Sequence, residues 1–146
     1  MPLVAALCLA AGAWHARIPV QAFTLRWQHS IEKLAWDEDW SVAGDWLYLS
    51  QARVRGSGAG MDPPADARLV DGAWVYRPAD PWRRELVLAR STFVRDYELC
   101  AAGRCRPLSA WIPVQAGPTT VTPCGIDDDA TAAARRGVAA PPAGSP

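Results

Sequence analysis

The sequence predicts an all-β domain, a small antiparallel β-sandwich or open barrel of about 7–8 strands with a disordered C-terminal tail. Three observations support this fold class. Apolar and polar residues alternate with a period of two, turn residues recur between these segments, and no long segment shows helical periodicity. With 146 residues, half of them hydrophobic, the chain is long enough for one domain with a buried core.

The expected strands are short and are separated by Gly, Pro and Asp. In the first of them, Phe23, Leu25 and Trp27 alternate with polar residues, as on a half-buried strand. The Asp71-Gly72 pair is a strong signal for a tight hairpin turn. The remaining expected strands cover residues 39–42 and 46–54 around a turn at 43–45, 68–70 and 73–76 around Asp71-Gly72, 85–91, 96–100, 104–108, and a last edge strand at 118–122.

Residues 1–13 form an apolar segment that is too short to span a bilayer. It resembles the apolar region of a secretory signal, with Ala11-Gly-Ala13 as a cleavage site, so we expect an exported protein. No basic residues precede this region, and the alternatives are a start upstream of Met1 or an ordinary buried segment. We therefore expect a single β domain at 22–124 and a disordered Ala/Pro/Gly-rich tail at 125–146.

Cysteine usage also favours an exported, oxidising location. Cys100 and Cys105 flank a four-residue loop, so a hairpin would bring them together as a disulfide. Zinc is the alternative, but C-x4-C without a second pair is a poor zinc pattern. Removal of Cys8 with a signal segment would leave Cys124 unpaired.

Charge and loop composition exclude several function classes. Fifteen basic and fifteen acidic residues leave no overall field that favours nucleic acid or an anionic membrane. The glycine-rich segment at 55–61 lacks the Lys-Ser/Thr of a phosphate loop, and two prolines after it block a helix. We therefore expect no nucleotide and no other cofactor.

His29, Ser30 and Glu32, followed by the acidic run at 37–39, form the most polar cluster of the chain. On the period of the first strand, His29 lies at the edge of the core, where Glu32 or Glu38 could hold its imidazole. The interpretations are a structural His–carboxylate pair that fixes the turn into the next strand, a ligand or partner site, a metal site, or a catalytic site.

Two further functions would use this cluster differently. A hydrolase would use His29 with a neighbouring carboxylate as base, although no G-x-S-x-G elbow is present. A divalent-cation module would use Asp37, Glu38 and Asp39, of which only two share a strand face. The cluster also carries Trp36 and Trp40, which suit a cationic or amphipathic partner, although we expect most of the tryptophans (Trp27, Trp36, Trp40, Trp46, Trp74, Trp82) to be core.

Several of these elements resemble one bacterial family, the domain of unknown function number 1850. The resemblance rests on the segment 23–33, an acidic residue at Glu38, the loop at 58–61 and the late segment 104–109. Members of that family are small exported or membrane-anchored proteins, commonly found beside TRAP transporters of the TAXI type. The resemblance implies a polar patch of His29, Ser30, Glu32, Gly58 and Gly60.

The hypothesis from the residues and the resemblance together is a non-enzymatic periplasmic or membrane-associated accessory domain of such a transporter. Its His29/Glu32/Glu38 edge and its glycine-rich loop, with Gly58 and Gly60, would contact a solute-binding protein, a permease or a small carboxylate. We expect no catalytic residue, no metal and no nucleic-acid partner.

Overall fold

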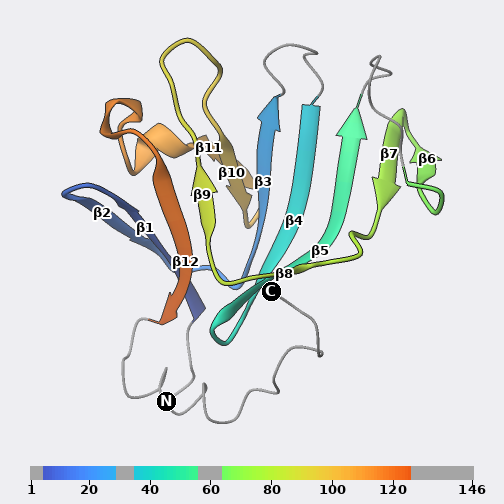
Figure 1. The fold of residues 1–146 in the computed structure, drawn as a ribbon, viewed down its shortest axis with the longest axis horizontal. Coiled ribbons are helices and arrows are strands. Elements are labelled where there is room, and N and C mark those ends of the chain that lie inside the picture. Colours follow the sequence, from blue (N-terminus) through green and yellow to red (C-terminus); the bar gives the residue numbers. More distant parts are fainter. Residues whose placement is uncertain (1–4, 29–34, 56–63, 126–146) are drawn as a thin grey trace.

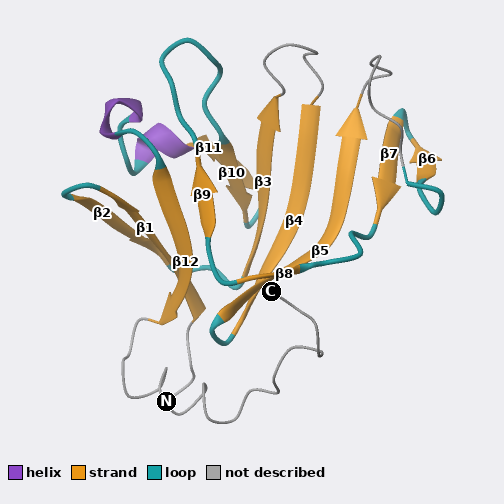
Figure 2. Ribbon diagram, in the orientation of Figure 1, coloured by secondary structure: helices purple, strands orange, loops and turns teal. Residues whose placement is uncertain are grey.

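Two antiparallel β-sheets face each other in a computed structural model that describes residues 5–28, 35–55 and 64–125 (Figure 1, Figure 2). The strands are β1 (Ala5–Ala11), β2 (Trp14–Ile18), β3 (Ala22–Gln28), β4 (Ala35–Ala43), β5 (Trp46–Arg55), β6 (Arg68–Val70), β7 (Ala73–Tyr76), β8 (Trp82–Arg83), β9 (Leu86–Leu88), β10 (Glu98–Ala101), β11 (Arg104–Pro107) and β12 (Thr119–Gly125). Two short 3-10 helices, η1 (Leu108–Ala110) and η2 (Val114–Ala116), connect β11 to β12. The all-β class and the open two-sheet architecture are thus confirmed, and the described residues contain more strands than the sequence predicted.

The smaller sheet has the order β2-β1-β12-β9. Its second strand, β1, comes from the apolar segment that resembles a secretory signal, and Leu7 and Leu9 on it are fully buried. Cleavage after Ala13 would remove this strand from the core, so the structure favours the alternative of an ordinary buried segment. The β domain therefore begins before residue 22, because β1 and β2 both belong to this sheet.

Cys8 on β1 and Cys124 on β12 form a disulfide with a Cα–Cα distance of 5.9 Å. The two strands are paired antiparallel, with Ala6 opposite Cys124 and Cys8 opposite Thr122. Cys124 is therefore paired in the intact chain, and only removal of Cys8 would leave it unpaired. Strand β12 was also wrongly predicted as an edge strand, since it lies between β1 and β9.

The larger sheet has the order β11-β10-β3-β4-β5-β7-β6, and β8 pairs with β5 beside this series. The predicted Asp71-Gly72 hairpin joins β6 to β7, and both residues have positive φ angles, 49° and 81°. This is the geometry of a two-residue turn that matches the strand twist. The predicted Cys100–Cys105 disulfide closes the β10–β11 hairpin and is confirmed.

The hydrophobic core lies between the smaller sheet and the β10-β3-β4-β5 part of the larger sheet. Its buried side chains come from both sheets and from η1, and they include Leu9, Val121, Leu25, Trp40, Leu47, Leu99 and Leu108. Strands β6 and β7 lie at the far side of the larger sheet from β1 and β2 (Figure 1). The inner face of the larger sheet therefore extends beyond the core.

A buried ion pair fixes the chain where the two sheets meet. The Arg90 side chain is 0% exposed, and its Nε and Nη2 donate to the two carboxylate oxygens of Asp96 at 2.9 Å each. The other guanidinium hydrogens are donated to the Thr119 hydroxyl and to the carbonyl oxygens of Ile112 and Pro113. All five guanidinium donors are thus satisfied, as a buried arginine requires.

No helix in the described parts of the chain is long and apolar enough to cross a membrane. The tail predicted to be disordered covers residues 125–146; Gly125 is the last residue of β12, and residues 126–146 lie outside the described residues.

Candidate functional site

The predicted site falls only partly on the described residues. His29, Ser30 and Glu32 lie outside them, as do Gly58 and Gly60. Glu38 is described, and so is the acidic run around it, which the sequence placed near a turn. In the structure this run lies within β4, which begins at Ala35. The pairing of β4 with β3 on one side and β5 on the other then decides what each carboxylate contacts.

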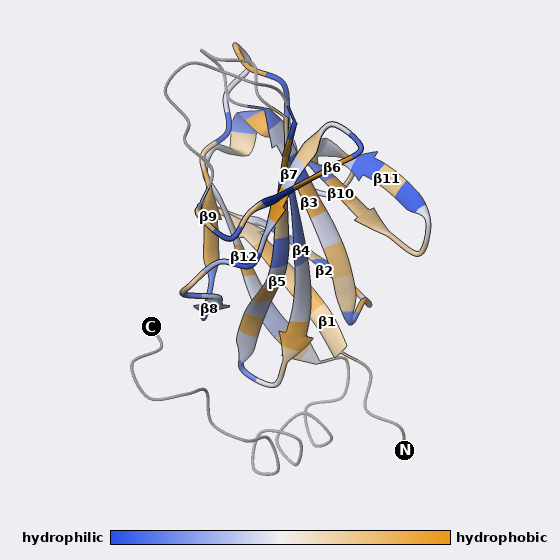
Figure 3. Ribbon diagram, turned by 90° about the vertical axis from the view of Figure 1, so that its right-hand side faces the viewer, coloured by the Kyte–Doolittle hydropathy of each residue, from blue (hydrophilic) through white to orange (hydrophobic). Residues whose placement is uncertain are grey.

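Neighbouring carboxylates of β4 point to opposite faces of the larger sheet, as the period of a strand requires. Asp37 pairs with Arg26 and Asp39 with Thr24, on the outer face away from the core. Glu38 pairs with the buried Leu25, so it lies on the inner face. Figure 3 shows the resulting alternation of hydrophilic and hydrophobic residues along β3, β4 and β5.

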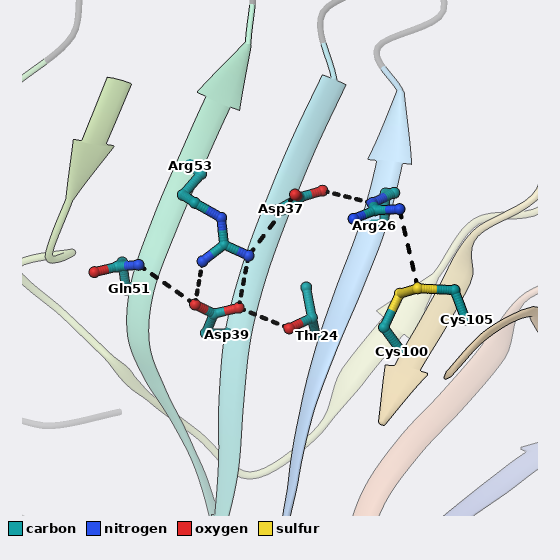
Figure 4. A network of polar contacts seen from close by, with 8 residues as sticks. All are labelled: Thr24, Arg26, Asp37, Asp39, Gln51, Arg53, Cys100 and Cys105. Carbon is teal, nitrogen blue, oxygen red and sulfur yellow. Dashed lines mark hydrogen bonds and ion pairs between the residues drawn. A yellow bond between two sulfur atoms is a disulfide. The ribbon is translucent and has the colours of Figure 1, made fainter. Parts of the chain in front are cut away.

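The two outer carboxylates belong to an ion-pair network across three strands (Figure 4). Arg26 Nε donates to Asp37 Oδ1 at 3.0 Å, and the Arg53 guanidinium makes two hydrogen bonds to Asp39. The Thr24 hydroxyl donates to Asp39 Oδ1 at 2.7 Å. The hydrogen bonds to Asp39 raise the pKa of Arg53 above its ordinary value.

This network counts against the predicted divalent-cation module. Asp37 is only 4% exposed, and Arg53 lies 3.7 Å from it while also binding Asp39. Two arginines therefore neutralise the two aspartates, and Glu38 faces the other way. Residues 5–28, 35–55 and 64–125 contain no group of three or more His, Cys, Asp or Glu side chains that could hold a metal ion.

Glu38 is the unusual residue of the inner face. Strand pairing places it in one row with four other residues across five strands, in the order Leu99, Leu25, Glu38, Ala52 and Tyr76. Its direct neighbours are thus an apolar side chain on one side and a small one on the other. A carboxylate in this position loses part of its hydration, which is unfavourable, and these two neighbours offer it no ion pair or hydrogen bond in return.

Aromatic rows flank the Glu38 row on both sides. On one side lies the row Trp27, Trp36, Val54, Trp74 and Leu69, and on the other the row Phe23, Trp40 and Leu49. Trp27 and Trp36 stack with ring centroids 5.1 Å apart and an interplanar angle of 7°. Because side chains two residues apart on a strand share a face, both Trp36 and Trp40 adjoin Glu38.

Burial raises the pKa of Glu38 above its ordinary value of 4.5. The indole N–H groups of Trp40 and Trp27 and the charge of Arg83 oppose this effect and favour the ionised carboxylate. The pKa values of Tyr76 and Tyr97 are also raised, first by burial and then by the negative charge of Glu38. Glu38 therefore acts electrostatically on side chains from β7 and from the segment before β10.

The indole nitrogens of Trp36 and Trp40 are buried and make no hydrogen bond of good geometry. Trp40 Nε1 is close enough to Glu38 to favour the ionised carboxylate. Buried polar groups without partners are uncommon in folded proteins, since each raises the free energy of the fold by about 1–3 kcal/mol. These two donors flank the half-buried Glu38 on one strand face, so we take this region as the candidate site.

Glu38 has no cationic partner within 4.0 Å among the residues that the structure describes. The nearby Arg83 is held elsewhere, since its Nη1 donates to the carbonyl oxygens of Asp80 and Trp82 and lies 3.7 Å from the Asp80 carboxylate. The arrangement thus presents a half-buried negative charge, aromatic surface and unpartnered donors. Such a site is suited to binding, whereas the predicted hydrolase depends on His29, which is outside the described residues.

The tryptophans divide between core and site. Trp40 is buried in the core at 4% exposure, and the other five, Trp27, Trp36, Trp46, Trp74 and Trp82, are half-buried. Trp46 and Trp82 lie edge to face, and the Arg84 guanidinium lies 4.3 Å from the Trp46 ring centroid. The prediction that most tryptophans are core was therefore too simple.

Sequence reasoning included Glu38 but missed Trp27, Tyr76 and Tyr97 as side chains that interact with it. One signal for the local part was present in Trp36-x-Glu38-x-Trp40, because alternate strand residues share a face. The contributions of β7 and of Tyr97 depend on strand order, which the sequence does not give.

A family model described as a domain of unknown function, DUF1850, matches residues 23–108, more than half of the chain. The matched region runs from the start of β3 to η1 and so contains Glu38 and its flanking rows. No curated protein and no solved structure matches the chain.

Proposed function

Because the chain belongs to the DUF1850 family, we propose that it is a non-enzymatic, exported binding domain that assists a TRAP transporter of the TAXI type. Its inner-face site at Glu38 contacts a transporter subunit, either the solute-binding protein or the permease. The glycine-rich loop with Gly58 and Gly60 and the His29-Ser30-x-Glu32 segment extend the contact surface. Two disulfides within the described chain support an oxidising, exported environment.

The observation that carries this proposal is the half-buried Glu38, enclosed by aromatic rows and lacking a described cationic partner. A purely structural carboxylate is normally paired, as Asp37 and Asp39 are on the other face of the same strand. A half-buried carboxylate without an ion pair to any described residue lowers stability, and such a loss is common where a residue serves binding. A small carboxylate ligand is less favoured than a protein partner, because its charge would oppose that of Glu38.

The test is an affinity measurement with a purified TAXI-type solute-binding protein from the same organism. Wild-type protein, Glu38→Gln and Glu85→Gln would be compared by calorimetry, and Glu85 is an exposed residue that supplies the matched control. We expect binding to the wild type and to Glu85→Gln, and a loss of about tenfold or more for Glu38→Gln. Absence of binding at micromolar concentration, or equal binding by all three proteins, would refute the proposal.

A further inference from the structure

The neighbours of Glu38 indicate what chemistry the site accepts. Strand pairing puts Leu25 on one side of Glu38 and Ala52 on the other, with Tyr76 one strand further. The short Ala52 side chain separates the carboxylate from the tyrosine ring. On the inner face, Glu38 therefore has apolar and aromatic surface around it in place of the arginines that hold Asp37 and Asp39 on the outer face.

The aromatic groups near the carboxylate come from several elements of the fold. Trp27 and Trp36 present one stacked pair from β3 and β4, with ring centroids 5.1 Å apart. Tyr76 contributes from β7, and Tyr97, just before β10, is close enough to sense the Glu38 charge. Aromatic faces attract cations, and the attraction is strongest where water is partly excluded.

We propose that Glu38 and the aromatic side chains around it form a binding site for an organic cation, an alkylammonium or guanidinium group. This inference rests on the proposed function, because it assigns a ligand class to the same site. The carboxylate supplies the opposite charge, and Trp27, Trp36 and Tyr76 supply ring surface for the ligand's alkyl or planar part. The cation is either a free amine or a lysine or arginine side chain of the transporter subunit.

Other charged groups near the site fit this assignment. Arg83 is the described cation that acts on Glu38, and Asp80 and two carbonyl oxygens already engage it. An incoming cation therefore does not have to displace an ion pair with any residue of 5–28, 35–55 or 64–125. The indole N–H groups of Trp36 and Trp40 are buried on either side of Glu38, so their resonances can report a ligand that binds there.

The experiment uses the indole N–H resonances in ¹H–¹⁵N NMR spectra of the ¹⁵N-labelled full-length protein. Trp36→Phe and Trp40→Phe variants assign the two signals at the site. Butylammonium, butylguanidinium, neutral butanol and anionic butyrate are titrated separately, so that the four probes share an alkyl chain and differ in charge. N-acetyl-lysine methylamide and N-acetyl-arginine methylamide represent a partner side chain with its flanking peptide carbonyls.

We expect the cations to shift the Trp36 and Trp40 signals in a saturable manner, at least tenfold more tightly than butanol. Glu38→Gln should weaken this binding by about tenfold or more, whereas Glu85→Gln should leave it unchanged. Tighter binding of the acetylated amino acids would identify a partner side chain, and tighter binding of the simple amines would identify a free amine.

Equal binding of cations and butanol, or preferential binding of butyrate, would overturn the inference. If Glu38→Gln is misfolded by circular dichroism, Glu38→Asp replaces it, since a shortened carboxylate keeps its charge and should bind more weakly than wild type. The two proposals can fail separately. If Glu38→Gln loses affinity for the solute-binding protein but the wild type binds no cation, the proposed function stands and only the ligand class is refuted.

Discussion

The two disulfides should stabilise the domain to very different extents, because they close loops of different length. Cys8 and Cys124 are 116 positions apart in the sequence, and Cys100 and Cys105 are 5 positions apart. In the chain-entropy description, a cross-link restricts the unfolded chain more when the loop it closes is longer. The same relation gives about 4.8 kcal/mol for the long loop and about 2 kcal/mol for the short one.

The perturbation is the replacement of each pair by alanine, giving Cys8→Ala/Cys124→Ala and Cys100→Ala/Cys105→Ala. Each variant loses two sulfur atoms, so the change in side-chain volume is matched and the loop length is the main difference. Urea unfolding followed by tryptophan fluorescence gives the free energy of unfolding by linear extrapolation. We expect the first variant to lose about 4–5 kcal/mol and the second about 2 kcal/mol relative to the oxidised wild type.

Two controls sharpen this prediction. Reduction of the wild type should reproduce the sum of the two losses, and each variant should respond to reductant only through its remaining disulfide. Equal losses for the two variants, or a larger loss for the short hairpin, would show that loop closure is not what the Cys8–Cys124 bond contributes. The strand pairing of β1 with β12 would then have to carry the stability of the smaller sheet.

Three further predictions concern charged side chains. Arg90→Met should lower the free energy of unfolding by about 3–5 kcal/mol, because it leaves the Asp96 carboxylate at the core margin without its positive partner. Urea unfolding measures this loss, and a loss below about 1 kcal/mol would contradict the prediction. Arg53→Met should lower the free energy of unfolding by about 1.5–3 kcal/mol, because it removes charged hydrogen bonds from Asp39. Urea unfolding also checks this prediction, and an unchanged unfolding midpoint would contradict it. The pKa of Glu38 is raised by burial, so the folded state binds its proton more tightly, and stability falls as the pH rises from 4.5 through the folded-state pKa. Glu38→Gln should therefore be more stable than wild type at neutral pH, with the gain vanishing well below pH 4.5, and a gain independent of pH would refute this explanation.

Local patterns were sufficient to predict much of the fold. Alternation located β3, the Asp71-Gly72 pair located a hairpin, and the Cys100–Cys105 spacing predicted a disulfide, because each depends on residues a few positions apart. The smaller sheet was missed because its central pair joins β1 to β12, and nothing in either segment alone specifies a partner so distant in the chain.

The candidate site shows the same limit. Trp36, Glu38 and Trp40 alternate along one strand, so their shared face follows from the sequence. Tyr76 reaches the same row only because β5 lies between β4 and β7. Of the acidic run, only Asp39 was predicted on a strand, because three consecutive carboxylates are unfavourable there, and the arginines that compensate two of them, Arg26 and Arg53, come from other strands.

The pairing of β1 with β12 has a consequence for how the molecule forms. Strand β1 is synthesised first among the described strands, and its backbone hydrogen bonds are complete only after β12, the last of them, has been synthesised and has paired with it. Contacts at such large sequence separation slow folding, because the ends of a long unfolded chain must meet before any energy is gained. The larger sheet, whose β3–β4–β5 neighbours follow one another along the chain, can assemble earlier, so closure of the sandwich is the slow step. A chain shortened before residue 119 should therefore leave β1 and β9 without their shared neighbour and expose the apolar inner face to aggregation.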